Sequence, residues 1–465
     1  MTENKVSRRT FLKTSAAAGA AGVIASGGLL TSCGSGGQDP NARRPIREPG
    51  TYYVPELLDW APDGRELKAG VIGCGARGSG AAFNFLNAAN GVTIHALGDA
   101  RMSQANGLAR RLEERSGIVV PPERRFDGLD AYKQVIDSGV DVIIEAVPPA
   151  FRPDIFAYAV QNNVHCFLEK PICIDPEGYR KVIAASRMAT ARNLTVVTGT
   201  QRHHDRAYVA SFQKIMEGWI GEITGGTVYW NQGFLWANGW DTNRSDFENM
   251  IADWVNWRWL SGDHIVEQHH HNLDVYTWFT GKRPVRCLGT GARHRRVTGD
   301  QYDNFHVAFE MEDGTHMQSM CRQMSGQQGS TYEFIQGTKG SWTSREHVIR
   351  DLEGNEIWRY DDAADREKFT QFDPYTLEHV DMICSIRGDR GLNQGEETAI
   401  SNMAAIMGRE AAYSGRRVTW DQMVASPQNL MPEDLSMTGR MDMSTFVVPV
   451  PGQPLGRTYA QPPNR

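Results

Sequence analysis

Between residues 67 and 199, short apolar runs alternate with longer segments in which apolar residues recur every three or four positions. Short apolar runs are typical of buried strands, whereas the longer periodic segments are typical of amphipathic helices. The predicted strands are 67–73, 92–98, 140–146, 164–168 and 194–199, and the predicted helices are 80–89, 132–138, 151–162 and 176–192. Regular alternation of this kind predicts an α/β fold with a parallel, doubly wound sheet, which binds ligands beyond the carboxyl ends of its strands.

A different pattern begins near residue 221. Strand-like segments follow one another with one helical segment, 263–279, between the first and the second, and Asp313-Gly314 predicts a hairpin turn between the last two. The predicted strands are 225–236, 284–292, 304–312 and 315–322. A further helix is predicted at 396–414. Strands grouped in this way predict a second domain of the α+β class.

Composition adds limits to this picture. The chain has 465 residues, 40% of them hydrophobic and 22% charged, which is typical of a globular protein with two domains. The formal net charge of −6 leaves no basic surplus for a polyphosphate backbone, so nucleic acid is not expected as a partner. After residue 33, no apolar run is long enough to span a bilayer. The seven cysteines form no CxxC pair, and all except Cys33 are expected to be reduced thiols in or near the core.

The first 33 residues predict an export signal. Arg8 and Arg9 precede a mildly apolar stretch, a pattern typical of the twin-arginine route, so the twin-arginine translocase is an expected partner. The stretch ends in a segment that resembles a bacterial lipobox with Cys33 as the lipidated residue, the alternative being a soluble periplasmic protein. We expect a location in the periplasm or cell envelope, with the lipid as the only membrane contact. The proline-rich residues 34–65 are interpreted as a tether or arm.

The pattern Gly73-x-Gly75-x-x-Gly78 lies between a predicted strand and a predicted helix, and Asp99 follows 21 residues later at the end of the next strand. This context is typical of dinucleotide binding, with Gly73 for the tight turn, Gly75 for the close approach of the pyrophosphate and Gly78 for helix–strand packing. Asp99 is expected to bind the adenosine ribose, which favours NAD, whereas Arg101 leaves NADP as the alternative. Residues 66–200 are therefore predicted to be an NAD(P)-binding Rossmann domain.

Further cofactor contacts are expected in the same loop and at the other strand ends. These residues are Ala76, Arg77, Val147, Pro148, Glu169 and Lys170. Twin-arginine substrates cross the membrane folded, and the periplasm has no exchangeable nicotinamide pool. We therefore expect the cofactor to be tightly bound, loaded before export and regenerated in place.

Glu169-Lys170-Pro171 follows a predicted strand and precedes a long predicted helix. Together with the glycine pattern, it resembles the Gfo/Idh/MocA family, named for glucose–fructose oxidoreductase, inositol dehydrogenase and a rhizopine-catabolism protein. The resemblance extends from about residue 67 to 274 and more loosely to 420. It implies a second domain, here 201–440, with an open, mostly antiparallel sheet that often mediates oligomerisation, so a homodimer or homotetramer is expected. Residues 441–465 are predicted to be an extended tail.

A second family signature lies on the helix predicted at 263–279. The family has an acidic residue, a histidine four positions later and an aspartate three further on, which Glu267, His271 and Asp274 match. Many members have aspartate where this chain has the longer Glu267, which puts the role of that residue in doubt. On one continuous helix, Glu267 and His271 would share a face.

The chemistry of these residue types agrees with the implied catalytic set of Lys170, His271 and Glu267. Oxidation of an alcohol needs a base for the hydroxyl proton while hydride leaves for the nicotinamide, and histidine is the usual base at neutral pH. The Lys170 ammonium would stabilise the developing alkoxide. Glu267 would hold the substrate or set the histidine tautomer. Structural roles for Lys170 and His271, as a surface lysine and a core histidine, are the alternatives.

Candidate substrate contacts surround this set. The predicted substrate-binding residues are Arg202, His203, Trp257 and His270. Polar side chains would form hydrogen bonds to substrate hydroxyls, and flat aromatic faces would pack on sugar rings. For any single tryptophan, core packing is the alternative. The three consecutive histidines from His269 to His271 also suggest a metal site. Consecutive residues on a helix diverge by about 100°, however, so no metal is expected.

Three functions follow from these residues. The first is an NAD(P)-dependent oxidoreductase that acts on a hydroxyl of a sugar, glycoside or cyclitol. The second is a glycosidase that uses NAD for transient oxidation followed by elimination, as some relatives of the family do. The third is a sugar-binding lipoprotein without catalysis, which the presence of both Lys170 and His271 disfavours.

Overall fold

The computed structural model describes residues 43–433 and 435–452, and the structural statements below concern these residues. The predicted signal with Cys33, the start of the predicted tether and the end of the predicted tail lie outside them.

The first half of the chain forms a six-stranded parallel sheet in the order β3-β2-β1-β4-β5-β6. This confirms the predicted doubly wound α/β fold. All five predicted strands are present, and the short β3 is an addition that the sequence pattern did not indicate. The strands are β1 (Leu67–Ile72), β2 (Val92–Asp99), β3 (Arg125–Asp127), β4 (Val142–Glu145), β5 (His165–Leu168) and β6 (Val196–Thr198).

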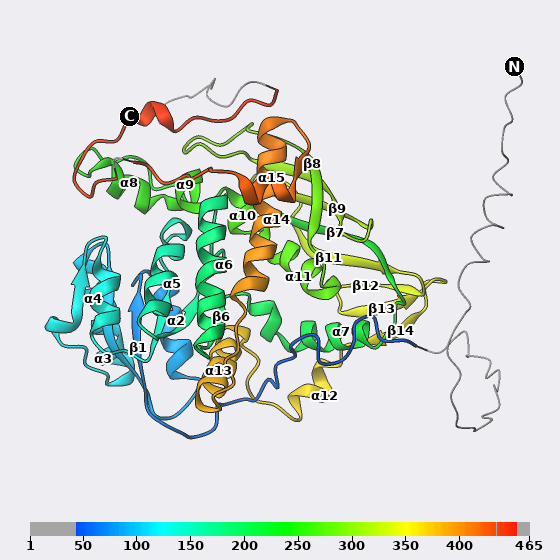
Figure 1. Cartoon of the computed structure of the whole chain (residues 1–465), viewed down its shortest axis with the longest axis horizontal. Coiled ribbons are helices and arrows are strands. Elements are labelled where there is room, and N and C mark those ends of the chain that lie inside the picture. The colour runs from blue at the N-terminus through cyan, green and yellow to red at the C-terminus, as the bar shows by residue number, and fades with distance from the viewer. Residues whose placement is uncertain (1–42, 434, 453–465) are drawn as a thin grey trace, which may run out of the picture. The chain divides into compact units, whose positions relative to one another are not determined.

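Helices cover both faces of this sheet (Figure 1). One face packs against α4 (Ala131–Asp137), α5 (Arg152–Gln161) and α6 (Pro176–Ala191). The other face packs against α2 (Ala76–Leu86), α3 (Met102–Ser116) and α13 (Pro374–Arg387). The sequence pattern predicted neither α3 nor α13. Although α13 comes from late in the chain, it completes the apolar core of this first sheet through Val380, Met382 and Ile383.

The second half forms a nine-stranded sheet in the order β14-β13-β12-β11-β7-β10-β9-β8-β15. Only β7 and β10 pair in parallel, so the sheet is mostly antiparallel, as the family resemblance implied. The strands are β7 (Ile223–Gln232), β8 (Pro284–Ala292), β9 (Asn304–Met311), β10 (His316–Gln323), β11 (Ser330–Gly337), β12 (Gly340–Thr343), β13 (Val348–Asp351), β14 (Glu356–Arg359) and β15 (Val418–Thr419).

The long helix α14 (Gly395–Ser414) runs between the two sheets and is almost completely buried (Figure 1). It contacts α6 on the side of the first sheet and β8, β9 and α11 (His270–Thr280) on the side of the second. The remaining helices are α7 (Arg206–Met216), α8 (Asp246–Ala252), α9 (Arg258–Ser261), α10 (His264–Glu267), α12 (Asp362–Arg366) and α15 (Trp420–Ala425).

The single helix predicted for 263–279 is wrong. The chain forms α10, two turn residues and then α11. At the break, the backbone N–H of His269 donates to the carbonyl of His264, five residues back, which widens the turn. The Gln268 side chain is held there by Gln232 and by Gln323 from the second sheet. Tertiary contacts to the sheet therefore accompany the interruption.

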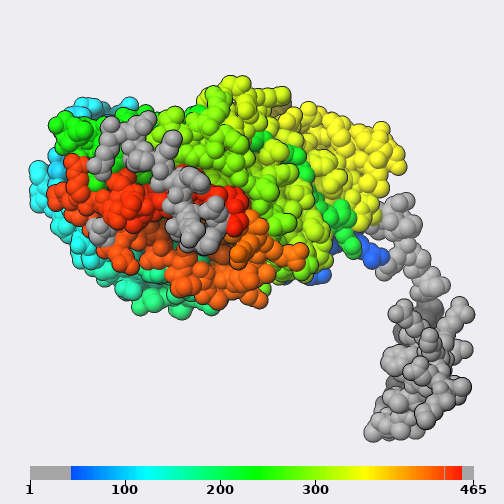
Figure 2. All heavy atoms as spheres, turned by 90° about the horizontal axis from the view of Figure 1, so that it is seen from above, coloured from blue at the N-terminus to red at the C-terminus, as the bar shows by residue number. Residues whose placement is uncertain are grey.

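The segment after α15 lies on the surface beside the part of the chain that contains α8 and α9 (Figure 2). Its Met441 and Phe446 pack against Trp257 in a small apolar cluster. All six cysteines in the described range are free, five of them buried and Cys384 half-buried, which agrees with the prediction of reduced thiols. In that range, no helix combines the length and apolar character needed to cross a bilayer, and no group of three or more metal-ligating side chains is present.

Candidate active site

The glycine loop after β1 combines two crowded positions with one open position. Gly73 has φ of +91°, and a Cβ placed on it would lie 2.7 Å from the backbone carbon of Ala146. A Cβ on Gly78 would lie 1.8 Å from the carbonyl oxygen of Gly73. A Cβ on Gly75 would meet no atom within 4 Å. The fold therefore requires glycine at the first and third positions, whereas the space above Gly75 is open for a ligand.

Helix α2 begins directly after Gly75, and no side chain caps its first turn. Helix N-termini attract phosphate groups because their N–H groups and partial positive charge point outward. Asp99 lies beside the loop, where its carboxylate accepts hydrogen bonds from the backbone N–H of Cys74 at 2.8 Å and of Arg101 at 3.0 Å. Burial raises the pKa of Asp99 against the opposite effect of these donors. The loop, the helix start and the carboxylate together form a cradle that fits a dinucleotide.

Arg152 of α5 ties together the two loops that follow β4 and β5. Its guanidinium donates to the carbonyls of Val147 at 3.0 Å, Glu169 at 2.7 Å and Pro171 at 2.8 Å. Arg152 is buried and also lies 3.5 Å from the fully buried Glu145, whose pKa burial raises to about 8. The backbone on either side of Lys170 is thereby fixed beside the glycine loop.

Arg77, the fifth residue of the glycine loop, is held by groups from two distant parts of the chain. It pairs with Glu169 after β5 and, at 3.0 Å, with Glu378 on α13. Its guanidinium also lies 4.6 Å from the ring centre of Tyr375. Burial raises the pKa of Glu378 well above the ordinary range, with Arg77 acting in the opposite direction. The side chain of Arg77 thus forms part of the floor between the glycine loop and Glu169.

A cavity of about 230 Å³ opens at this place. The Lys170 ammonium lies in it and donates to the Glu267 carboxylate at 3.0 Å and to the Glu267 carbonyl at 2.6 Å. Both side chains are only slightly exposed. The lining residues are Arg77, Ala146, Arg152, Glu169, Lys170, Gly199, Gln201, Trp254, Glu267, His271 and Tyr375.

His271 lines the same cavity from the first turn of α11. Its ring stacks on Trp230 with a centroid distance of 5.6 Å, and no hydrogen bond to its imidazole is found among the described residues. Burial lowers the pKa of His271 well below 6.5, and the positive charges of Lys170 and Arg202 act in the same direction. The imidazole is therefore neutral at neutral pH.

The structure does not bring the four candidate substrate contacts to this cavity. Arg202 lies behind Trp230 and pairs with the buried Glu333 at 2.7 Å. Trp257 is buried in the cluster under the C-terminal segment. His203 and His270 belong to a buried network in which Asp274 accepts from His203 and from Ser401, at 2.7 and 2.8 Å, and Ser401 meets His270 at 2.8 Å. Asp274, the last residue of the family pattern, thus supports the network behind His271.

Several cavity residues were not among the candidate site residues predicted from the sequence. Tyr375 comes from α13, Trp254 from the loop after α8, and Gln201 follows β6. The carboxyl end of the predicted strand at 194–199 was the one available pointer to Gln201. Tyr375 reaches the cavity through tertiary packing that local patterns do not encode, whereas Trp254 belongs to the tryptophan-rich stretch just before the helix predicted at 263–279.

Family models match three parts of the chain. Residues 67–198 match the model described as oxidoreductase family, NAD-binding Rossmann fold. Residues 212–343 match the GFO/IDH/MocA C-terminal domain, and residues 5–25 match the twin-arginine translocation signal sequence. NAD is therefore the cofactor of the first domain, and the signal directs the chain to export by the twin-arginine route.

Curated relatives are inositol dehydrogenases. The scyllo-inositol 2-dehydrogenase (NAD(+)) of Bacillus subtilis (strain 168) is 27% identical over 243 residues, which cover 52% of this chain and 62% of the relative. Inositol 2-dehydrogenase 4 of Saccharopolyspora erythraea is 25% identical over 203 residues, covering 43% of this chain and 56% of the relative. The matched region thus spans a little over half the length of these relatives.

Solved structures share the fold over a larger part of the chain. The scyllo-inositol dehydrogenase from Lactobacillus casei with bound NAD(H) and scyllo-inositol superposes with a TM-score of 0.58 at 20% identity, covering 78% of this chain and all of that one. The UDP-N-acetylglucosamine 3-dehydrogenase from Acidithiobacillus ferrooxidans gives 0.56 at 18% identity, covering 75% and 98%. At this level of identity, the similarity concerns the fold.

Proposed function

Because the chain belongs to the Gfo/Idh/MocA family of NAD-binding oxidoreductases, we propose that it oxidises a hydroxyl group of a sugar, glycoside or cyclitol with a tightly held NAD. The observation that carries this proposal is the convergence of Lys170, Glu267 and His271 on one cavity beside the glycine loop. An ammonium, a carboxylate and a neutral imidazole are the groups that alcohol oxidation requires.

The cofactor would be held at the carboxyl ends of the parallel strands. The open space above Gly75 and the uncapped start of α2 suit the pyrophosphate. The carboxylate of Asp99, beside this loop, would accept hydrogen bonds from the adenosine ribose. The nicotinamide end of the cofactor would reach the two loops that the hydrogen bonds of Arg152 hold in place. These loops contain Val147 and Pro148 after β4, and Glu169 and Lys170 after β5. When bound, NAD supplies the acceptor for the hydride that leaves the carbinol carbon.

Lys170 would orient the substrate hydroxyl and stabilise the charge that grows on its oxygen. Its ammonium is fixed by two hydrogen bonds to Glu267, which leaves one of its N–H donors for the substrate. Glu267 contacts Lys170 rather than His271, so its role here is to position the ammonium. Glu267 is the last residue of α10, and both its carboxylate and its backbone carbonyl accept hydrogen bonds from Lys170.

His271 would accept the hydroxyl proton. Its pKa is lowered by burial and by nearby positive charge, so the imidazole is unprotonated before the reaction. After the transfer, the proton from the hydroxyl oxygen would rest on an imidazole nitrogen, the hydride would have left the carbon that bears this oxygen, and the carbon and oxygen would form a carbonyl.

Export adds a constraint on turnover. The twin-arginine signal implies passage in the folded state, and we infer that NAD is loaded before export and stays bound. The reduced cofactor would then be reoxidised in place by a second carbonyl compound. A lipid on Cys33, a location in the periplasm or cell envelope, and a homodimer or homotetramer belong to the same proposal.

The test begins with protein purified after native export. Nicotinamide released by acid denaturation should be close to one per chain, and polyols, sugars and glycosides are then screened by absorbance of the bound cofactor and by product analysis. Reduction of bound NAD by one substrate class is expected. Release of free sugar from a glycoside without net reduction would instead identify redox-assisted glycoside cleavage. Protein that contains no nicotinamide, and binds none when it is added, would overturn the proposal.

A further inference from the structure

Asp263, which precedes α10, has a backbone conformation that glycine normally occupies. Its φ is +75° and its ψ is 160°, whereas the other five non-glycine residues with positive φ in the described part of the chain have φ between 47° and 59°. A side chain crowds the backbone in this region, so the conformation persists only where surrounding contacts fix it. Residues held in this way gather at active sites, and Asp263 lies four residues before Glu267.

The carboxylate of Asp263 makes the contacts that hold this conformation. One of its oxygens accepts from the backbone N–H and the ring of His264, at 2.6 and 2.9 Å. The other accepts from the backbone N–H of Tyr302 at 3.0 Å and from the hydroxyl of Tyr413. Burial acts to raise the pKa of Asp263, but His264 and Tyr413 are among the contacts that hold it below its ordinary value. A charged, buried carboxylate thus ties the start of α10 to the loop between β8 and β9 and to the last turn of α14.

Helix α10 passes the conformation of Asp263 on to Glu267. The helix has four residues, which is too short to keep its geometry without other contacts. The carbonyl of Asp263 accepts from the backbone N–H groups of Val266 at 3.0 Å and Glu267 at 2.9 Å. Glu267 ends the helix, and its carboxylate and carbonyl hold the Lys170 ammonium. The direction of the chain at Asp263 therefore determines where that ammonium is held.

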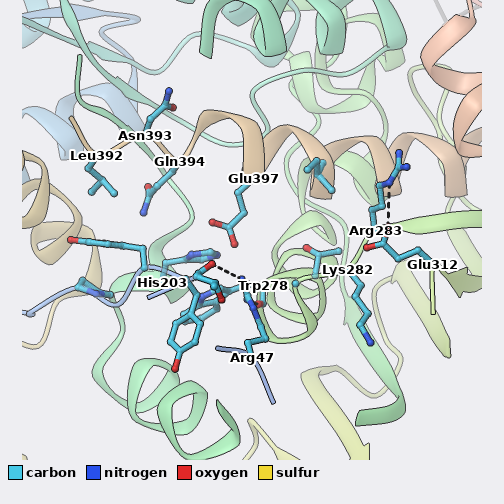
Figure 3. Close-up of a pocket in the computed structure, with 17 residues that line it drawn as sticks. Arg47, His203, Trp278, Lys282, Arg283, Glu312, Leu392, Asn393, Gln394 and Glu397 are labelled. Atoms are coloured by element: carbon cyan, nitrogen blue, oxygen red, sulfur yellow. Dashed lines mark hydrogen bonds and ion pairs between the residues drawn. The ribbon is translucent and has the colours of Figure 1, made fainter. Parts of the chain in front are cut away.

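Helix α11, which carries His271, is fixed by other parts of the chain. Near its end, the carbonyl of Trp278 accepts from Arg47 of the N-terminal arm at 3.0 Å (Figure 3). The ring of Trp278 stacks on those of His203 and Phe212, with ring centres 4.1 and 4.6 Å away. The break at residues 268–269 separates α11 from α10. A change at the start of α10 should therefore leave His271 in place.

We propose that Asp263 is a positioning residue: its strained backbone and its buried carboxylate aim α10 so that Glu267 holds the Lys170 ammonium in the candidate active site. Asp263 itself does not line the cavity. The catalytic part of this inference rests on the proposed function, whereas the hold on Lys170 is measurable without turnover.

The chemical reactivity of Lys170 tests this hold. The full chain with bound NAD is treated with acetic anhydride, and mass spectrometry compares acetylation of Lys170 with that of Lys133, an exposed lysine outside the cavity. Lys170 is 14% exposed and held by Glu267, so it should react slowly in the wild type. Asp263→Asn keeps the size of the side chain but removes its charge, and should raise the relative rate at Lys170 about 5-fold or more.

Asp246→Asn is the matched control. Asp246 is buried like Asp263, and its carboxylate also accepts a backbone N–H from a distant segment, that of Met441 at 2.9 Å. It lies on α8 and does not line the cavity, so its loss should cost stability but leave the acetylation of Lys170 unchanged. Tyr413→Phe removes one donor to Asp263 and should raise the rate less than Asp263→Asn does. It takes the place of Asp263→Asn if that variant does not fold.

Steady-state kinetics test whether Asp263 acts through Glu267. Asp263→Asn should lower kcat about 10-fold or more in the wild type but less than about 2-fold in Glu267→Gln, because the contact that it supports is already lost there. The proposal is overturned if Asp263→Asn, or Tyr413→Phe in its place, raises Lys170 acetylation no more than Asp246→Asn does, or if kcat falls by the same factor in both backgrounds. Increased acetylation in a protein that oxidises no alcohol would contradict the proposed function alone.

Discussion

The cofactor side and the substrate side of the candidate active site are built in different ways. On the cofactor side, the geometry comes mostly from the consecutive residues Gly73–Gly78, with the backbone of Ala146 after β4 closing the space beside Gly73. On the substrate side, Lys170 follows β5, Glu267 ends α10 and His271 lies beyond a break in the helix. The first side depends on local backbone space, whereas the second depends on distant elements that hold charged groups in a buried place. Substitutions should therefore act on the two sides by different physical routes.

The largest expected effect is on the cofactor side, at Gly78. Gly78→Ala would place a methyl group 1.8 Å from the Gly73 carbonyl, so the helix start must shift, and we expect a loss of about 3 kcal/mol or more in stability together with loss of NAD binding. Gly75→Ala is the matched control, because its methyl meets no atom within 4 Å. It should change stability by less than about 1 kcal/mol yet weaken NAD binding. Thermal unfolding and NAD titration measure both, and equal destabilisation by the two variants would contradict this account.

The substrate side should instead lose rate without losing the cofactor. Lys170→Met removes the ammonium that would stabilise the developing alkoxide, and we expect kcat/KM to fall about 100- to 1000-fold while NAD binding is retained. The change also leaves the Glu267 carboxylate without its partner, which costs stability on its own account.

The double variant Lys170→Met/Glu267→Gln separates these two effects. The amide removes the unpaired charge, so the double variant should recover stability but not activity. Recovery of activity in the double variant, measured by steady-state kinetics beside thermal unfolding, would show that Lys170 acts on the fold rather than on the substrate.

The same contrast explains how much the sequence could predict. The parallel sheet, the Gly73–Gly78 loop and the carboxylate of Asp99 follow from apolar runs and local turn chemistry, and the structure has the predicted strands in these places. Lys170 and His271 were predicted as catalytic residues from the family resemblance, because hydrophobic periodicity does not identify catalytic side chains. The predicted continuous helix at 263–279 failed because contacts from Gln268 to the second sheet lie outside any local window.

Other parts of the site were beyond a local pattern for the same reason. Helix α13 carries Tyr375 and Glu378 to the glycine loop from about 300 residues later, and its role depends on packing against the first sheet. His203 and His270 were expected at the substrate because of their residue type. Their placement with Asp274 and Ser401 shows that the same side chains also satisfy one another in a buried network.

The smallest expected effect is on the pH dependence of the free energy of unfolding, and it comes from His270 in the buried network behind the substrate side. Burial lowers the pKa of His270 to about 4, whereas in the unfolded chain it is about 6.5, so the unfolded state binds more protons in between. The stabilising contribution of neutral His270 is complete above pH 6.5 and is lost as pH falls toward 4, by about 2 kcal/mol between pH 7 and pH 5.

His270→Gln should lower the free energy of unfolding at pH 7 but reduce its dependence on pH in this window. His316→Asn, at an exposed position on β10, is the control and should leave the slope unchanged. Denaturant unfolding at a series of pH values measures the slopes, and an unaltered slope in His270→Gln would mean that the buried network, rather than His270 alone, takes up the proton.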